Sequence, residues 1–147
     1  MSLVISKLEA SHVAGLWPYI EAGVKEIHRL SGGSFGWGPL DVRAALEQKK
    51  ALACFVYFDK ERVGFFILRF FEDEFSRKKY VHVWLAYQYP DFHPQSDLMI
   101  EVWDWIENEA RKLGARYIEW DSNRAAWQKR AVDLGAKPHR TVYRKEL

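Results

Sequence analysis

The sequence predicts a mixed α/β fold in which helices cover both faces of one β-sheet. Three observations predict it. Two long stretches repeat apolar residues at helical spacing, three consecutive stretches are rich in aromatic and β-branched residues, and those three are apolar on both faces. The expected order is strand, two helices, three strands, helix, strand, helix, strand. With 147 residues, 48% of them hydrophobic, the chain suits one domain spanning residues 1–147.

The N-terminal residues predict a short strand followed by a long amphipathic helix. Residues 4–7 suit the strand, and apolar residues recur at helical spacing through residues 13–27. Ser11 is a candidate N-cap for this helix, and Pro18 should kink it because an interior proline removes one backbone hydrogen bond. The glycine-rich residues 31–41 then predict a mobile loop.

The middle of the chain predicts a second helix and a run of strands. The helix is expected to begin at Pro39 or Asp41 and to end at Gln48. The charged residues after the first strand suit a hairpin turn, and a proline ends the third strand. The three strands are expected at residues 51–58, 62–71 and 80–89.

The C-terminal part predicts helix, strand, helix and strand. Apolar positions recur at helical spacing from Leu98 to Leu113, and Gly114 stands where a glycine often ends a helix. The remaining elements are expected to be a strand at 115–120, a shorter helix within 123–135 and a last strand at 141–147.

Charge and composition argue against several classes of protein. Lysine and arginine number 22 against 20 acidic residues, without a clustered basic face, so nucleic acid is not an expected partner. No apolar run approaches the ~20 residues of a membrane helix. The single cysteine, Cys54, lies in an apolar run, and no metal-ligand spacing is present, so no metal is expected. We expect a soluble cytoplasmic protein, with a homodimer left open.

The last third of the chain carries a family resemblance. The run "ARKLGARYIEWDSNRAAWQKRAVDLGAKPHRTVYRKEL", together with the order of elements, closely resembles the Gcn5-related N-acetyltransferase superfamily. In that family a glycine-containing turn leads to the fifth strand, an Asn-containing loop and a helix that closes on Leu-Gly-Phe. Here Gly114, Asn123 and residues 133–135 take these places. The resemblance implies a mostly antiparallel mixed sheet and an acetyltransferase that uses acetyl-CoA.

The same resemblance places the cofactor's pyrophosphate at residues 94–99. The family binds it on the backbone amides of a glycine-containing loop, where the positive end of a helix dipole favours phosphate. In this chain Gln95, Asp97 and Met99 occupy the usual glycine positions, and the Asp97 carboxylate adds negative charge there. Ser96 and Asp97 equally suit the start of their own helix. The cofactor loop is therefore degenerate.

Further positions bear on the cofactor and the leaving group. By the resemblance, Asn123 would touch the coenzyme, and Trp127 could contact its pantetheine arm. Asn123 equally suits a helix cap, and Trp127 a place in the core. Many family members place a tyrosine four residues before the glycine of the last helix as the general acid. Ala131 stands there in this chain, so an acid must come from elsewhere.

Three residues of the predicted strand at 80–89 are candidates for catalysis. His82 could act as a base near neutral pH, since the ordinary pKa of histidine is about 6.5. A lone histidine in an apolar strand is also typical of a hydrogen-bonded core residue. Tyr87 and Tyr89 lie nearer the strand end and could replace the missing acid, or could simply pack with their hydroxyls in water.

The glycine-rich loop between the first two helices is the candidate acceptor site. In the family this region forms the wall over the acceptor, and here His28, Ser31 and Trp37 could shape the pocket. A flexible surface loop with one anchored tryptophan is the alternative.

Two hypotheses of function follow. The first is an acetyl-CoA-dependent N-acetyltransferase with an atypical cofactor loop, acting on an amine of a small molecule or protein. The second is a catalytically inactive binding or assembly module of the same fold, for example an accessory protein of a phage or mobile element. The module would be favoured if tryptophans formed one exposed patch. It would also be favoured if Trp84, Tyr87 or Trp120 filled the gap between the fourth and fifth strands.

Overall fold

Five strands form one mixed sheet in the order β1-β2-β3-β4-β5. In this computed structural model, which describes residues 3–32, 36–92, 97–122 and 126–147, neighbouring strands from β1 to β4 run antiparallel and β5 runs parallel to β4. The strands are β1 (Leu3–Lys7), β2 (Ala51–Phe58), β3 (Glu61–Glu72), β4 (Lys79–Gln88) and β5 (Tyr117–Glu119). The helices are the 3-10 turn η1 (Ala10–His12), α1 (Val13–Leu30), α2 (Pro39–Glu47), α3 (Asp97–Lys112) and α4 (Ala126–Asp133).

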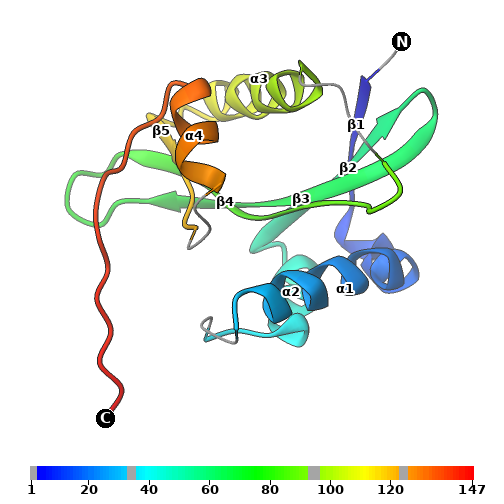
Figure 1. Ribbon diagram of the computed structural model, residues 1–147, viewed down its shortest axis with the longest axis horizontal. Coiled ribbons are helices and arrows are strands. Elements are labelled where there is room, and N and C mark those ends of the chain that lie inside the picture. Colours follow the sequence, from blue (N-terminus) through cyan, green and yellow to red (C-terminus); the bar gives the residue numbers. More distant parts are fainter. Residues whose placement is uncertain (1–2, 33–35, 93–96, 123–125) are drawn as a thin grey trace.

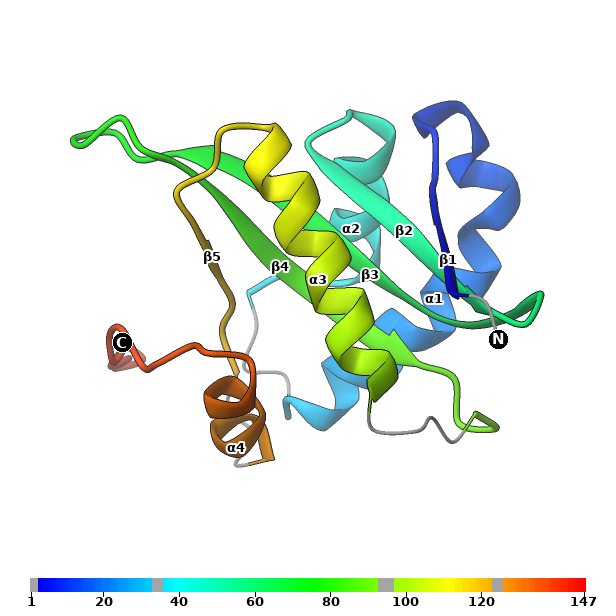
Figure 2. The same ribbon diagram turned by 90° about the horizontal axis from the view of Figure 1, so that it is seen from above.

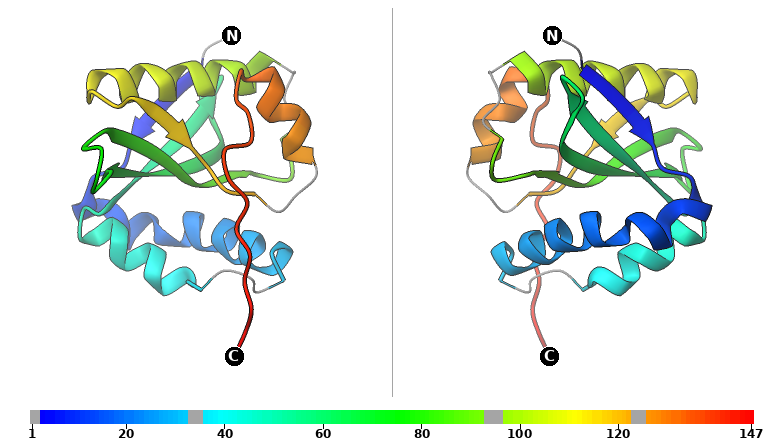
Figure 3. Two further views of the ribbon diagram at one scale, coloured as in Figure 1. Left: turned by 90° about the vertical axis from the view of Figure 1, so that its left-hand side faces the viewer. Right: turned by 90° about the vertical axis from the view of Figure 1, so that its right-hand side faces the viewer.

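The helices form two layers on opposite sides of the sheet. Helices α1 and α2 lie on one side, and α3 and α4 lie on the other, as Figures 1 and 3 show. The core is divided in the same way. Ile20, Val42, Phe65 and Ile67 belong to the cluster beneath α1 and α2, whereas Phe66, Leu68 and Ile106 belong to the cluster beneath α3. Strands that are apolar on both faces need both layers, and the prediction of two-sided coverage is confirmed.

Close contacts bring α1 against the centre of the sheet. A Cβ atom on Gly23 would lie 2.6 Å from Cδ1 of Tyr87 and 2.7 Å from Cε1 of Phe65. On β3, a Cβ atom at Gly64 would collide with the backbone oxygen of Tyr87. These glycines therefore set how closely α1, β3 and β4 can approach.

A β-bulge interrupts β4 at its midpoint. Ile67 pairs with Leu85, but the next residue, Leu68, pairs with Val83, so Trp84 has no ladder partner on β3. A bulge leaves an extra residue outside the ladder and increases the local twist. It turns β4 at the point where β5 ends beside it.

The start of α1 differs from the sequence-based expectation. Helix α1 begins at Val13 after η1, and its N-cap is His12, with no side-chain hydrogen bond at the cap. The expectation for Ser11 was therefore wrong, because the 3-10 turn moves the helix start beyond it. The helix continues through Pro18 to Leu30. The kink expected at this interior proline stays a prediction.

The expected last strand is absent from residues 136–147, which have no regular secondary structure. Val142 and Tyr143 are 77% and 91% exposed, and Arg140 lies 3.9 Å from Glu119 of β5. Strand β5 spans only Tyr117–Glu119, so it offers few backbone partners to a further strand. The C-terminal segment passes β5 and extends beyond the α1–α2 layer (Figure 1).

Candidate functional site

The candidate site lies where β4 and β5 part. The two strands pair through Tyr80 and Tyr117, Val81 and Ile118, and His82 and Glu119. Beyond His82, β4 continues to Gln88 with no β5 partner among the described residues, while the chain after β5 turns toward α4 (Figure 2). A mixed sheet that opens between two parallel strands provides a place for an extended ligand.

His82 and Asp121 meet at this opening. Nε2 of His82 lies 3.4 Å from Oδ2 of Asp121, a long separation for a hydrogen bond. The His82 side chain is 13% exposed, whereas that of Asp121 is 71% exposed. Nδ1 of His82 is buried and has no hydrogen-bond partner within the described part of the chain. The imidazole thus has one buried nitrogen and one nitrogen beside a solvated carboxylate.

The surroundings favour the neutral form of His82. Burial lowers its pKa from the ordinary value, and the positive charge of Arg69 lowers it as well. The carboxylates of Asp121 and Glu119 act in the opposite direction. The lowered pKa means that the imidazole is neutral and able to accept a proton at pH 7.

A row of aromatic side chains lines the α1–α2 side of the sheet next to His82. Trp84 packs edge-on against Trp37 with ring centroids 5.3 Å apart, and Trp37 lies 6.2 Å from His28 in turn. The guanidinium of Arg69 lies over the rings of Phe71 and Trp84, at 4.6 and 4.7 Å. The structure therefore brings the predicted acceptor residues His28 and Trp37 toward the β4 bulge.

Ser31 has a local role in the described structure. Its hydroxyl donates a hydrogen bond of 2.7 Å to the backbone oxygen of His28 at the end of α1. This bond satisfies one of the free carbonyls at the helix end. Its assignment to the acceptor pocket stays a prediction.

Tyr87 and Tyr89 lie farther along β4, away from His82. At about 3.3 Å per residue, Tyr87 is roughly 17 Å from His82 along the strand. Tyr87 packs against Phe65 beneath α1, and the Tyr89 hydroxyl donates a 3.2 Å hydrogen bond to the backbone oxygen of Tyr19. Burial also raises the pKa of Tyr89. The structure therefore does not bring these tyrosines to the same point as His82.

The predicted cofactor contacts fall largely outside the described residues. Gln95, Ser96 and Asn123 are not described, and neither are the side chains of Asp97 and Trp127. Helix α3 begins at Asp97, as the resemblance implies, and Gly114 has a positive φ of 77° just after the helix. That left-handed conformation suits glycine and ends α3 where the sequence predicts. The roles of the five cofactor residues stay predictions.

The structure places Ala131, the position at which the resemblance led us to expect a tyrosine, in the last helix. Ala131 lies in α4, and its backbone oxygen accepts a 2.8 Å hydrogen bond from the backbone nitrogen of Ala136. An alanine side chain offers no proton to a leaving group. Met99 is half-buried and packs against the core beneath α3.

The tryptophans whose side chains are described do not form an exposed patch. Among the six tryptophans whose side chains are described, Trp17 and Trp103 are buried and the others are half-buried. Trp84 turns to the α1–α2 side, where it meets Trp37, whereas Trp120 turns to α3, where its ring centroid lies 4.7 Å from that of Trp103. Both rings therefore pack onto a helix layer.

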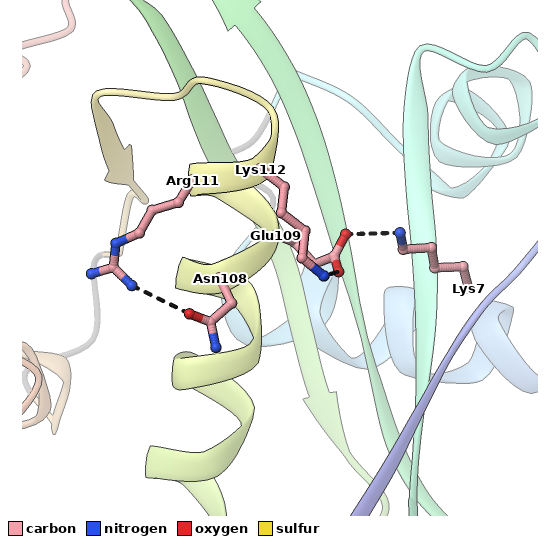
Figure 4. A network of polar contacts seen from close by, with 5 residues as sticks. All are labelled: Lys7, Asn108, Glu109, Arg111 and Lys112. Carbon is pink, nitrogen blue, oxygen red and sulfur yellow. Dashed lines mark hydrogen bonds and ion pairs between the residues drawn. The ribbon is translucent and has the colours of Figure 1, made fainter.

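A cavity of about 540 Å³ lies elsewhere, between the end of α3 and the β3–β4 strands. Leu68, Phe70 and Trp105 line it, and His82 and Asp121 do not. At its border Lys7 donates a 2.8 Å hydrogen bond to Glu109, which also pairs with Lys112 (Figure 4). This ion pair connects β1 to α3, and the cavity belongs to that packing and not to the opening between β4 and β5.

The described residues contain no group of three or more histidine, cysteine or acidic side chains arranged to hold a metal ion. None of the described helices combines the length and the apolar character needed to cross a lipid bilayer.

Sequence reasoning missed Asp121, Arg69 and the bulge at Trp84. Asp121 directly follows the strand run "ARYIEW", so its place at a strand end was visible in the sequence. Its partner was not visible, because the meeting with His82 depends on the parallel register of β5 against β4. Arg69 is the one charged residue in the run "VGFFILRFF", which is the signal that could have identified it.

Solved structures share this fold over the full length of the chain. A ribosomal-protein-alanine N-acetyltransferase from Brucella melitensis biovar Abortus 2308 matches with a TM-score of 0.72 at 15% identity, covering 99% of this chain and 100% of that one. An aminoglycoside acetyltransferase from an uncultured soil metagenomic sample matches with a TM-score of 0.71 at 16% identity, covering 100% and 99%. An integron cassette protein from the mobile metagenome of V. cholerae matches with a TM-score of 0.69 at 13% identity, covering 99% of this chain and 93% of that one.

No protein-family model matches the sequence, and no curated protein matches it either. The structural matches nonetheless show that the chain has the fold of the Gcn5-related N-acetyltransferases. The predicted fold class, a mostly antiparallel mixed sheet between two helix layers, is confirmed.

Proposed function

We propose that the protein is an acetyl-CoA-dependent N-acetyltransferase that acts on an amine of a small molecule or protein through an atypical cofactor loop. The observation that carries this proposal is the pair of His82 and Asp121 at the point where β4 and β5 part. A neutral imidazole beside a carboxylate is a suitable base for an ammonium group. Two of the structural matches are acetyltransferases, which supports the same reaction class.

His82 is the proposed general base. When its proton resides on the buried Nδ1, Nε2 can accept a proton from the acceptor's ammonium group. The imidazolium formed in this way is stabilised by Asp121, whose Oδ2 lies 3.4 Å from Nε2. Asp121 also offers the incoming ammonium group a negative charge. It acts as a positioning residue that holds the imidazole and the amine at one place.

The described part of β4 suits a thioester between the strands. Trp84 lacks a ladder partner on β3, and the residues after His82 lack one on β5. Backbone amides in such a stretch can donate to a carbonyl oxygen on which negative charge develops. Acetyl-CoA would supply the activated acyl group as a thioester. The amides of β4 from Val83 onward would hold the carbonyl, and the start of α3 would receive the phosphates.

The leaving thiolate needs a proton, and the chain offers fewer donors for this step. Tyr87 and Tyr89 stay the proposed candidates, with the Tyr89 proton already donated to Tyr19. A water molecule in the opening could equally supply the proton. The proposed acceptor wall is formed by His28, Ser31 and Trp37 at the end of α1 and the start of α2. We further propose a cytoplasmic setting.

The alternative is an inactive binding module, for example of a mobile element, and one of the structural matches is an integron cassette protein. The side chains that replace the loop glycines favour this module. The half-buried tryptophans do not, since none of those described forms an exposed patch.

A thermal-shift titration with acetyl-CoA, coenzyme A and a control nucleotide tests the proposal. Ligand at one hundred times its Kd should stabilise the native state by about 2.7 kcal/mol. For a domain of this size the Tm should rise by roughly 5 to 10 °C. An unchanged Tm at millimolar coenzyme would refute the acetyltransferase and leave the binding module.

An acetyl-transfer assay with an amine panel then tests the base. His82→Gln should lower kcat/KM by about 10² to 10⁴-fold while leaving the coenzyme-induced shift in place. His139→Gln is the matched control, because His139 is an exposed histidine in the C-terminal segment. Equal activity of the two variants would exclude His82 as the base.

A further inference from the structure

Arg69 lies in an unusual position on β3 beside the candidate site. Its backbone pairs across the sheet with His82, and its guanidinium carbon lies 4.6 Å from the Phe71 ring centroid and 4.7 Å from that of Trp84. The residue is half-buried. The two rings fix the plane of the guanidinium, as such stacking generally does for arginine.

No carboxylate among the described residues pairs with this guanidinium. Arg62, the other arginine of β3 whose guanidinium lies over an aromatic ring, donates a hydrogen bond of 3.2 Å to the hydroxyl of Tyr57. In the described part of the chain, by contrast, no hydrogen bond or ion pair of the Arg69 side chain is found. An arginine side chain carries five N–H donors and no acceptor. The Arg69 donors are therefore held in place without a protein acceptor among these residues.

Two more polar atoms on the same side of the sheet lack partners. Nδ1 of His82 and Nε1 of Trp84 are both buried, and neither has a hydrogen-bond partner among the described residues. Buried polar atoms are nearly always hydrogen-bonded, so two of them on residues two positions apart in one strand require an explanation. Trp84 Nε1 is always a donor, and His82 Nδ1 is a donor in the tautomer that leaves Nε2 free to act as base.

Together these atoms form a cluster of donors that calls for an acceptor with negative charge. We infer that the acceptor substrate is an amine that carries an oxyanion, a carboxylate or a phosphate, which the guanidinium of Arg69 and the indole N–H of Trp84 bind next to His82. This inference rests on the proposed function, since it names the substrate class of the same site. A planar guanidinium receives such oxyanions through two parallel hydrogen bonds.

Two carboxylates lie near His82 and carry the charge opposite to that of Arg69. Asp121 lies beside Nε2, and Glu119 is the β5 residue paired with His82. Arg69 and the two carboxylates thus surround the imidazole with a positive and a negative side. A zwitterion fits this arrangement, with its oxyanion at Arg69 and its ammonium group between Nε2 and Asp121.

The spacing limits the distance between the two groups of the acceptor. Arg69 and His82 are directly opposite on neighbouring strands, where Cβ atoms lie about 4.5–5.5 Å apart. The ammonium and the oxyanion should therefore be separated by only a few bonds, as in an amino acid or a phosphorylated amino alcohol. A polycation such as an aminoglycoside would place an ammonium group against Arg69.

The transfer balances with this acceptor. The ammonium group gives one proton to Nε2 of His82, and the free amine attacks the thioester carbonyl. A C–N bond forms, the C–S bond breaks, and the nitrogen loses a second proton. The thiolate takes up one of the two protons, and the other passes to solvent. The oxyanion takes no part in the bond changes and serves to orient the amine.

A titration followed by NMR of the tryptophan indole N–H signals tests the inference without a need for activity. The Trp84 signal is assigned with Trp84→Phe, and coenzyme A is titrated first as a separate test of the proposed function. The probes are L-amino acids and their amides, O-phosphoethanolamine and ethanolamine, and an aminoglycoside. We expect a saturable shift of the Trp84 signal with members of one oxyanion class, and at least tenfold weaker binding of the matched neutral amines.

Variants of two arginines make the result specific. Arg69→Gln should weaken oxyanion binding at least tenfold, and Arg69→Lys should restore it in part because the charge remains. Arg62→Gln is the matched control, since Arg62 is also a β3 arginine whose guanidinium lies over aromatic rings, those of Phe55 and Tyr57 on β2, roughly 23 Å away from Arg69 at the rise of a strand. Circular dichroism at the assay temperature shows whether each variant is folded. Oxyanion binding should be unchanged in Arg62→Gln.

The outcomes separate the two proposals. Preference for amino acids identifies a carboxylate, and preference for O-phosphoethanolamine identifies a phosphate. Equal binding of the amides, tight binding of the aminoglycoside, or a folded Arg69→Gln variant with unchanged affinity would overturn the inference. If coenzyme A binds but one of these three results is obtained, the oxyanion inference is refuted and the proposed acetyltransferase function is not. Oxyanion binding that depends on Arg69, without coenzyme binding, would support the oxyanion site and refute the proposed acetyltransferase function.

Discussion

Two glycines of α1 provide a sharp test of how this helix meets the sheet. Gly23 faces the rings of Phe65 and Tyr87, and an added Cβ would lie 2.6 to 2.8 Å from their atoms. Gly15 lies in the first turns of the same helix, and an added Cβ there would meet nothing within 4 Å. The substitutions Gly15→Ala and Gly23→Ala therefore share the same gain in helix propensity and differ only in packing.

The magnitudes follow from these contacts. Replacing glycine by alanine in a helix stabilises it by about 0.5–1 kcal/mol. At Gly23 the rings must move, and overpacking of this kind costs about 1–3 kcal/mol. Gly15→Ala should raise the free energy of unfolding, whereas Gly23→Ala should lie about 1–3 kcal/mol below it. At about 2–4 °C for each kcal/mol, the two Tm values should differ by roughly 2–12 °C.

Thermal melts of both variants, followed by circular dichroism and repeated with chemical denaturant, give this difference directly. Equal stabilisation by the two alanines would refute the reasoning, because it would mean that α1 does not pack against Phe65 and Tyr87. The position of Tyr87 against α1 would then need another account.

The remaining predictions concern the site, the core and the C-terminal segment. Because burial lowers the pKa of His82, kcat/KM should rise with pH with a midpoint below about pH 6.5. A midpoint above that pH would contradict the lowered pKa. Asp121→Asn removes a charge that raises this pKa, so the His82 titration seen by NMR should move to lower pH, and a move upward would exclude the pair. Burial raises the pKa of Cys54 to about 12, so its thiol should stay unmodified by alkylating reagents until the protein unfolds, as quantified by mass spectrometry. Removal of residues 141–147 should change the free energy of unfolding by less than about 0.5 kcal/mol, whereas a clear loss would indicate that the expected last strand forms in solution.

Local patterns account for most of what could be predicted. Helix α3 repeats apolar residues at helical spacing and is followed by Gly114, whose positive φ of 77° matches the expected helix end. The two-residue turn at Asp59 and Lys60 connects β2 and β3, both residues having positive φ, as in a tight hairpin. These features depend on residues that are close in sequence, so periodicity and turn chemistry suffice to find them.

Prediction failed where an outcome depended on distant partners. The run "TVYRKEL" has the composition of a strand, but a strand forms only where an edge offers backbone partners, and β5 ends after Glu119. Ser11 has the chemistry of an N-cap, but η1 shifts the start of α1 to Val13. In both cases the local propensity was present and the tertiary context decided against it.

The sequence by itself determined the fold class, the order of the strands and α-helices from β1 to α4, and the strand that carries His82, because the spacing of apolar residues in these segments is a local property that the fold retains. Only the tertiary structure decided which groups surround that histidine. The parallel register of β5 places Asp121 at Nε2, and the antiparallel register of β3 places Arg69 opposite, between the rings of Phe71 and Trp84. Registers depend on the packing of both sheet faces against helices from other parts of the chain, and no single segment contains that information.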